Sequence, residues 1–235
     1  MARVVSLAGC LLMTVALMFP RPAEACLWGQ SATGELNGTR TSNSGIQATD
    51  GWGNGNFVLS WNISRDPGTG LWTYVYTADV VRKDISHFIL EVSQDGDLFR
   101  TYPGTDTQVV GPQVWSSTTD GNSNPQMPNS IYGVKFDFGG TQATYTMVTD
   151  RAPVYGVFYA KDGKDGGVPV VAWSNALNYS DYKTLDSLTA ADFIVRPDSA
   201  TFVPIPAALP LFSSGLALLG VLRKRIEGTM RNYPE

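Results

Sequence analysis

The chain has 235 residues, with 17 Lys and Arg against 21 Asp and Glu, one His and two Cys. With one imidazole and two thiols, the chain alone cannot build a four-thiolate zinc site, a mixed site of two thiolates and two imidazoles, or a His-Glu-x-x-His site. The net charge of −4 argues against nucleic-acid binding, which depends on Lys and Arg neutralising phosphates.

Residues 1–25 have the pattern of a secretory signal peptide. A basic start precedes an apolar run, residues 4–19, that is too short to cross a bilayer, and Ala23 and Ala25 stand at the −3 and −1 positions. We therefore expect cleavage before Cys26, with a short buried helix as the alternative. Cys26 would then be the only thiol of the mature chain, so it is free, lipidated or paired with another chain.

The segment that follows, residues 26–202, is predicted to be one exported domain of β-strands. Residues 26–206 contain 11 basic and 18 acidic residues, a net charge of −7, together with all six Trp, nine of the ten Tyr and 20 of the 24 Gly. This mixture of turn formers and sheet formers, with little Leu or Glu, favours strands over helices.

Apolar and polar residues alternate along several short segments of this domain. The period of two is clearest at residues 57–64, 87–92 and 132–138. Further candidate strands are residues 71–81, 107–115, 143–149, 154–160, 168–174 and 192–196. Turn residues separate them at 66–70, 95–97, 139–140 and 162–167. Eight or nine strands without intervening helices predict an all-β fold, an antiparallel β-sandwich or jelly roll in a single domain.

Two stretches of the domain are less regular. Residues 29–56 are rich in Gly, Ser, Thr and Asn, so we expect them to wrap the sandwich as a loop or edge strand. Residues 117–130 are expected to form a long loop, and long loops on a rigid sheet are frequent binding sites.

Residues 203–222 form 20 consecutive uncharged positions, about the length that crosses the hydrocarbon core of a bilayer. The basic residues Arg223, Lys224 and Arg225 follow at once, and such a cluster is retained on the cytoplasmic side of the membrane. We therefore expect a C-terminal transmembrane helix, followed by a short tail at residues 226–235. A buried core helix is the alternative, but the run has no polar stripe to face water.

A proline motif opens this segment and leads directly into the apolar run, with the residues Val203, Pro204, Ile205, Pro206 and Ala207. The order of motif, apolar segment and basic cluster over residues 203–225 resembles the PEP-CTERM sorting signal of bacterial exosortase substrates. The resemblance implies that an exosortase, a membrane-embedded cysteine transpeptidase, cuts at the motif and passes the protein to the surface or the matrix. Ile205 stands where the family usually has Glu, and residues 226–235 follow a cluster that normally closes the chain. A permanent C-terminal membrane anchor is the alternative.

The middle of the chain is also similar to one group of PEP-CTERM proteins of unassigned activity. The similarity is carried by residues 84–88, 131–137, 150–163 and 192–198. It implies no catalytic residues.

Titratable residues that could carry chemistry are few. His87 and Glu91 lie four residues apart on one predicted strand, about 13 Å apart at roughly 3.3 Å per residue, which is too far for a direct hydrogen bond. A Ser-His-Asp triad around His87 is one interpretation, but the sequence has no Gly-x-Ser-x-Gly motif to position the Ser. We therefore expect His87 to be a non-catalytic side chain exposed on a strand face. Glu91 with Asp79 or Asp137 could form a glycosidase pair, although nothing in the sequence selects one pair.

Acidic turns and aromatic residues offer two further binding hypotheses. The turns at residues 95–97 and 162–165 could supply carboxylates to Ca²⁺, but neither matches an EF-hand loop, and we predict no metal and no other cofactor. Trp72, Tyr74 and Trp115 could stack on sugar rings, with burial in the core as the alternative.

The sequence therefore predicts an exported, non-enzymatic protein of the cell envelope or extracellular matrix, structural or adhesive, with polysaccharide association as one version of this role. Its expected partners are an exosortase, exopolysaccharide and, transiently, the inner membrane of a bacterium with an outer membrane. The alternatives are a secreted polysaccharide-acting hydrolase and a permanently anchored binding protein.

Overall fold

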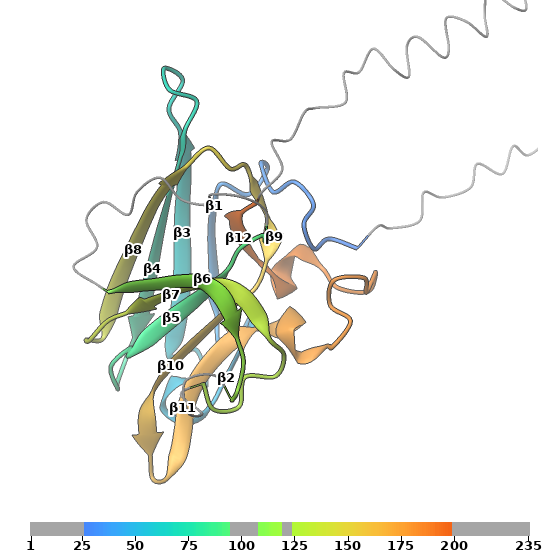
Figure 1. Cartoon of the computed structure of the whole chain (residues 1–235). Helices are drawn as coiled ribbons and strands as arrows, with labels where there is room; N and C mark the ends of the chain where they lie inside the picture. Colours follow the sequence, from blue (N-terminus) through green and yellow to red (C-terminus); the bar gives the residue numbers. More distant parts are fainter. Residues whose placement is uncertain (1–25, 95–107, 119–123, 199–235) are drawn as a thin grey trace, which may run out of the picture.

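A computed structural model describes residues 26–94, 108–118 and 124–198 (Figure 1). Six predictions concern residues outside these ranges: the signal peptide with Ala23 and Ala25, the acidic turn at 95–97, the sorting motif from Val203 to Ala207, the apolar segment, the basic cluster Arg223, Lys224 and Arg225, and the tail at 226–235. Within the described residues, no helix is both long enough and apolar enough to cross a membrane.

About half of the described residues lie in β-strands, the only helices among them are three short 3₁₀ helices, and the strand pairs are antiparallel, so the all-β prediction is confirmed. The four-stranded sheet has the order β1 (Asn37–Thr41), β3 (Phe57–Arg65), β4 (Trp72–Val80), β8 (Gln142–Thr149). The six-stranded sheet has the order β2 (Ile46–Ala48), β11 (Val168–Ser174), β10 (Phe158–Asp165), β5 (His87–Glu91), β7 (Ile131–Asp137), β6 (Val109–Trp115). A small ribbon pairs β12 (Ile194–Pro197) with β9 (Pro153–Gly156).

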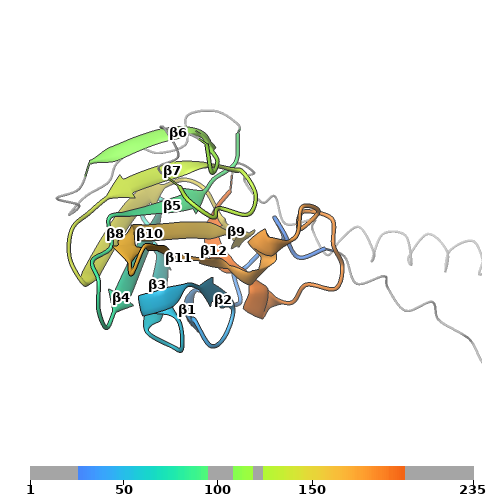
Figure 2. The same cartoon turned by 90° about the horizontal axis from the view of Figure 1, so that it is seen from below.

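The two larger sheets face one another across a shared aromatic core (Figure 2). Phe88 of β5 stacks on Tyr145 of β8, with ring centroids 4.9 Å apart, and on Phe158 of β10 at 5.4 Å. Phe57 of β3 stacks on Phe158 from the opposite sheet at 5.9 Å. These contacts follow from the period-two pattern, which places one set of large side chains on the inner face of each sheet.

A second apolar cluster covers the outer face of the six-stranded sheet. Ile89, Tyr159 and Val171 point away from the shared core and pack against a segment that contains two short 3₁₀ helices, η2 (Asn175–Asn178) and η3 (Ala190–Asp192). This segment, orange in Figures 1 and 2, lies on the same side of the molecule as β9 and β12. All five residues of β5 are therefore buried, because both of its faces are covered.

One sequence prediction about the strands is confirmed and two need correction. Residues 29–56, expected as a loop or edge strand, contain the edge strands β1 and β2. The expected strand at 154–160 is two strands, because the chain leaves the β9–β12 ribbon at Val157 and joins the six-stranded sheet as β10. The expected turn at 162–167 is shorter, since β10 continues to Asp165 and the left-handed residues Gly166 and Gly167 make the reversal.

Candidate functional site

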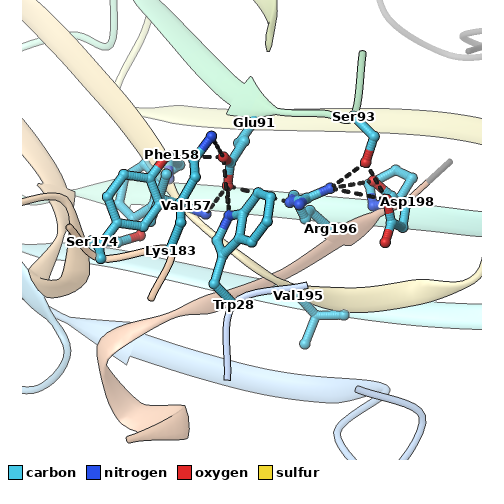
Figure 3. A network of polar contacts seen from close by, with 12 residues as sticks. Trp28, Glu91, Ser93, Val157, Phe158, Ser174, Lys183, Val195, Arg196 and Asp198 are labelled. Carbon is cyan, nitrogen blue, oxygen red and sulfur yellow. Dashed lines mark hydrogen bonds and ion pairs between the residues drawn. The ribbon is translucent and has the colours of Figure 1, made fainter. Parts of the chain in front are cut away.

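Two oppositely charged side chains are buried where the N-terminal segment, β5 and β12 meet (Figure 3). Glu91, the last residue of β5, is 1% exposed, and Arg196 of β12 is 0% exposed. Arg196 Nε lies 3.3 Å from Glu91 Oε2. Buried charges of this kind are stable only when their remaining hydrogen-bonding groups are also satisfied, so the surrounding contacts define the site.

The Glu91 carboxylate is surrounded by donors from four further residues. Trp28 Nε1 lies 3.1 and 3.0 Å from the two carboxylate oxygens, Oε1 and Oε2. The Val157 amide donates to Oε2 at 3.1 Å, and the Tyr182 hydroxyl donates to Oε1 at 3.0 Å. Lys183 Nζ lies 3.4 Å from Oε1. The carboxylate is thereby fixed as an acceptor for the N-terminal segment, the β9–β10 crossover and the 175–193 segment at once.

Arg196 extends from this carboxylate to a second group of acceptors. Its Nη1 donates to Ser93 Oγ and to the Pro197 carbonyl, both at 3.1 Å, and lies 3.8 Å from Asp198 Oδ1. The Ser93 hydroxyl also donates to Asp198 Oδ1. Gly156 makes room for the guanidinium, since a Cβ at this position would lie 2.2 Å from Arg196 Nε.

A cavity of about 540 Å³ opens beside this network, lined by Trp28, Gly29, Val92, Ser93, Gln94, Tyr132, Lys183 and Asp198. The Trp28 ring has Lys183 Nζ at 4.6 Å and Arg196 Cζ at 5.3 Å from its centroid. Two cationic groups, those of Lys183 and Arg196, therefore lie close to the indole, and the carboxylates of Glu91 and Asp198 balance their charge.

The titration behaviour of Tyr182 suits it to donate a hydrogen bond. Burial and the neighbouring Glu91 carboxylate both raise the pKa of the Tyr182 hydroxyl, so that it stays protonated at neutral pH. Its proton is held on the Oε1 side of the carboxylate. The arrangement favours a fixed ion pair, with both carboxylate oxygens of Glu91 hydrogen-bonded, over an acid or base that exchanges protons with a substrate.

The carboxylates proposed as partners of Glu91 do not contact it. Asp79 lies on β4 in the other sheet and accepts from Gln142 Nε2 at 2.5 Å. Asp137 lies on β7, opposite His87 in the strand register, and forms an ion pair with Lys135 at 3.3 Å. Neither glycosidase pair is assembled.

His87 was expected on an exposed strand face, and this prediction is wrong. The side chain is buried at 4% exposure, because Asn124 and Pro125, in the connection between β6 and β7, contact that face of the six-stranded sheet. His87 Nε2 lies 2.9 Å from Asn124 Oδ1, and the imidazole packs 6.2 Å from the Tyr159 ring. Burial, followed by the charges of Lys161 and Lys135, lowers the pKa of His87 to about 3.

The proposed sugar-stacking residues are not brought together on the surface. Tyr74 and Trp115 are fully buried, so neither ring can stack on a sugar, and this part of the hypothesis is wrong. The Tyr74 hydroxyl donates to the Arg151 carbonyl, and Trp115 Nε1 donates to the Gly133 carbonyl. Trp72 is half-buried at the end of β4, with Arg65 Cζ 5.5 Å from its ring centroid.

The described residues also include the second acidic turn, residues 162–165, and Cys26. Asp162 accepts from Ser86 Oγ at 3.1 Å, and Asp165 forms ion pairs with Arg82 and Lys83. Among the described residues, no group of three or more His, Cys, Asp or Glu side chains could hold a metal ion. Cys26 is half-buried with a free thiol, and its Sγ lies 3.6 Å from the Tyr182 carbonyl.

Most of this network is not predicted from the sequence. From the sequence, Glu91 is a candidate only for a glycosidase pair, and no role is predicted for Trp28, Lys183 or Arg196. A signal was present, because Glu91 and Arg196 each end an otherwise apolar strand segment. A charge at such a position favours a buried ion pair.

Comparison with protein-family models, with curated proteins and with solved structures finds no match.

Proposed function

We propose that this chain is an exported, non-enzymatic protein of the cell envelope or extracellular matrix, sorted by an exosortase-type system. In this proposal residues 26–202 form one jelly-roll-like domain between an N-terminal signal helix and a C-terminal transmembrane helix. Residues 203–225 act as the sorting signal. The protein passes through an inner-membrane intermediate and then acts as a structural or adhesive component at the surface or in the matrix.

The observation that supports this proposal is the junction of the two ends of the described domain. The Gly29 amide donates to the Tyr155 carbonyl of β9 at 2.9 Å, and the Tyr155 amide donates to the Gln30 carbonyl at 3.1 Å. On its other edge, β9 pairs with β12. The N-terminal segment and the last strand thus flank the same strand, and Trp28 and Arg196 meet on Glu91.

This junction suits a domain tethered at both ends. A signal peptide before residue 26 and an apolar anchor after residue 202 would be held in one membrane during export. Attachment points on one side of the domain let it fold close to that membrane. Trp28 and Asp198 line the same cavity, so the first and last parts of the domain meet this condition.

The same network favours a structural role over a hydrolase. Hydrolysis of glycosides needs two carboxyl groups roughly 5 to 10 Å apart that are free to take and give protons. Glu91 is instead contacted by five donor groups, and neither Asp79 nor Asp137 approaches it.

Mass spectrometry of the released protein, from strains with and without the exosortase, tests the sorting proposal. We expect the mature chain to begin at Cys26 and to end within the motif, and to be retained in the membrane when the exosortase is absent. A variant with Pro204→Ala and Pro206→Ala should also be retained. The matched control, Pro210→Ala in the apolar run, should be released. A released chain that extends to Glu235 would contradict processing and would leave the permanent anchor.

A further inference from the structure

The outer face of the four-stranded sheet carries an array of uncharged polar side chains. Strand register places them in rungs that cross the sheet, the central two being Asn37, Asn62, Val75 and Thr146, and Thr39, Ser60, Thr77 and Thr144. The flanking rungs are Thr41, Val58, Asp79 and Gln142 on one side, and Ser64, Thr73 and Val148 on the other. These positions alternate with the buried core positions, so they point away from the sandwich.

The central rungs are hollowed into a shallow groove of about 450 Å³ across β1, β3 and β4. Its polar walls come from Asn37, Thr39, Ser60, Asn62 and Thr77. The side chains are ordered by one another: Asn62 Nδ2 donates to Asn37 Oδ1 at 2.5 Å, and Thr77 Oγ1 lies 3.4 Å from Thr144 Oγ1. Hydroxyl and amide groups in such an array can both donate and accept hydrogen bonds.

Charged side chains are sparse on this face. Residues 26–206 carry 18 acidic and 11 basic residues, yet among the rung positions Asp79 alone is charged, and it is paired with Gln142. A face that serves only solubility normally mixes Lys, Arg, Glu and Asp. The hydroxyl and amide composition instead suits a partner that is itself polar and uncharged.

The groove is also held rigidly. β3 and β4 pair over nine consecutive residues without a bulge, and β8 continues the register over eight. A surface that is fixed before binding loses little conformational entropy when a ligand docks. Neighbouring strands are about 4.8 Å apart, so hydroxyl and amide groups repeat at that interval across the groove.

From these observations we infer that the groove over β1, β3 and β4 binds a neutral polysaccharide chain. A polymer of uncharged hydroxylated rings can donate to and accept from the hydroxyl and amide groups of the groove, each of which can make further hydrogen bonds beside those within the face, and its lack of charge matches that of the groove. The aromatic rings considered from the sequence have no part in this site. The inference rests on the proposed function in one respect, since a matrix protein is in contact with polysaccharide.

Affinity electrophoresis of the purified full chain in mild detergent tests the inference. The gels contain dextran, hydroxyethylcellulose or galactomannan as neutral probes, and alginate as an anionic probe. We expect at least one neutral polymer, and not alginate alone, to retard the protein. Ser60→Arg and Thr77→Val, inside the groove, should weaken the retardation by roughly tenfold.

Matched controls on the same strands and face are Ser64→Arg and Thr73→Val, which lie outside the groove lining. They should stay within about twofold of the wild type. An equal loss of retardation in the groove variants and in the control variants would overturn the inference. So would the absence of retardation by any neutral probe. So would a change of oligomeric state in Ser60→Arg, measured by light scattering, because the face would then join two copies of the chain. Processing at the motif is measured separately, so either proposal can fail alone.

Discussion

Glu91 and Arg196 show how far a single residue can be interpreted from sequence. Each interrupts an apolar strand pattern, which predicts that its charge is buried and paired. The pairing itself could not be predicted, because 105 positions separate the two residues and β12 reaches Glu91 only through its antiparallel pairing with β9. The contact between Trp28 and Glu91 was still harder to predict, because nothing in the local sequence of Trp28 indicates a buried acceptor.

The buried pair leads to a first prediction. Glu91→Gln should lower the free energy of unfolding by about 3–5 kcal/mol, because the buried Arg196 would lose the nearer of its two counter-charges and keep only Asp198 at 3.8 Å. Urea denaturation followed by tryptophan fluorescence measures the change. The exposed variant Asp186→Asn is the control, and it should be nearly neutral.

A double variant separates the charge effect from lost packing. Glu91→Met with Arg196→Met removes both charges, so its loss of stability should be smaller than the sum of the two single losses. If the losses simply add, the ion pair is not the interaction that Glu91 provides, and the indole, hydroxyl and amide contacts would carry its effect.

At the scale of elements, strands were predictable where one face meets the shared core. Residues 57–64 and 71–81 correspond to β3 and β4 because large side chains alternate with small polar ones. β1 was not predictable from this pattern, since its sequence of Asn, Gly, Thr, Arg and Thr contains no apolar alternation. Val157 was missed for the opposite reason: the apolar pattern continues through it, although the chain changes sheets there.

A close contact with β3, and not an apolar alternation, positions β1 at the edge of its sheet. This contact gives a second prediction. Gly38 lies opposite Trp61 in the register, and a Cβ on Gly38 would lie 2.1 Å from the Trp61 ring. The indole cannot retreat easily, because its Nε1 donates to the Glu35 carbonyl at 3.0 Å. Gly38→Ala should therefore destabilise the protein by about 1–3 kcal/mol, the usual cost of overpacking a core.

Thermal unfolding of Gly38→Ala beside Gly163→Ala checks this prediction. Gly163 also lies in a strand, but a Cβ there meets no atom within 4 Å. The Gly163 variant should unfold close to the wild-type temperature, whereas the Gly38 variant should unfold several degrees lower. An equal lowering in both variants would contradict the contact with Trp61 as the cause, because the backbone-entropy effect of Gly→Ala is stabilising in both.

At the scale of the whole molecule, the structure has one feature that the sequence does not predict. The six-stranded sheet has a core on both faces, since the 175–193 segment and residues 124–127 of the β6–β7 connection cover its outer side. The apolar residues Ile89, Tyr159 and Val171 on that side were visible in the sequence. Their covering could not be predicted, because short 3₁₀ helices and loops lack a periodic pattern.

The outer covering makes global stability depend on pH through one side chain, which gives a third prediction. His87 is the only His of the chain, and burial, with Lys161 and Lys135, lowers its pKa to about 3 against roughly 6.5 in an unfolded chain. Between these values the unfolded state binds more protons than the folded state, so stability falls as the pH falls. The contribution of His87 is fully present above about pH 6.5 and decreases toward pH 3.

From pH 7 to pH 4.5 the protonation of His87 should remove roughly 2–3 kcal/mol from the free energy of unfolding, measured in urea at both pH values. His87→Gln keeps an N–H donor for Asn124 Oδ1 but does not titrate, so its free energy of unfolding should change much less over this range. The carboxylates, including Asp66 with its lowered pKa, are the same in both proteins and cancel in the comparison. An equal pH dependence in the two proteins would mean that the covering over β5 opens far enough to hydrate a protonated imidazole in the folded state.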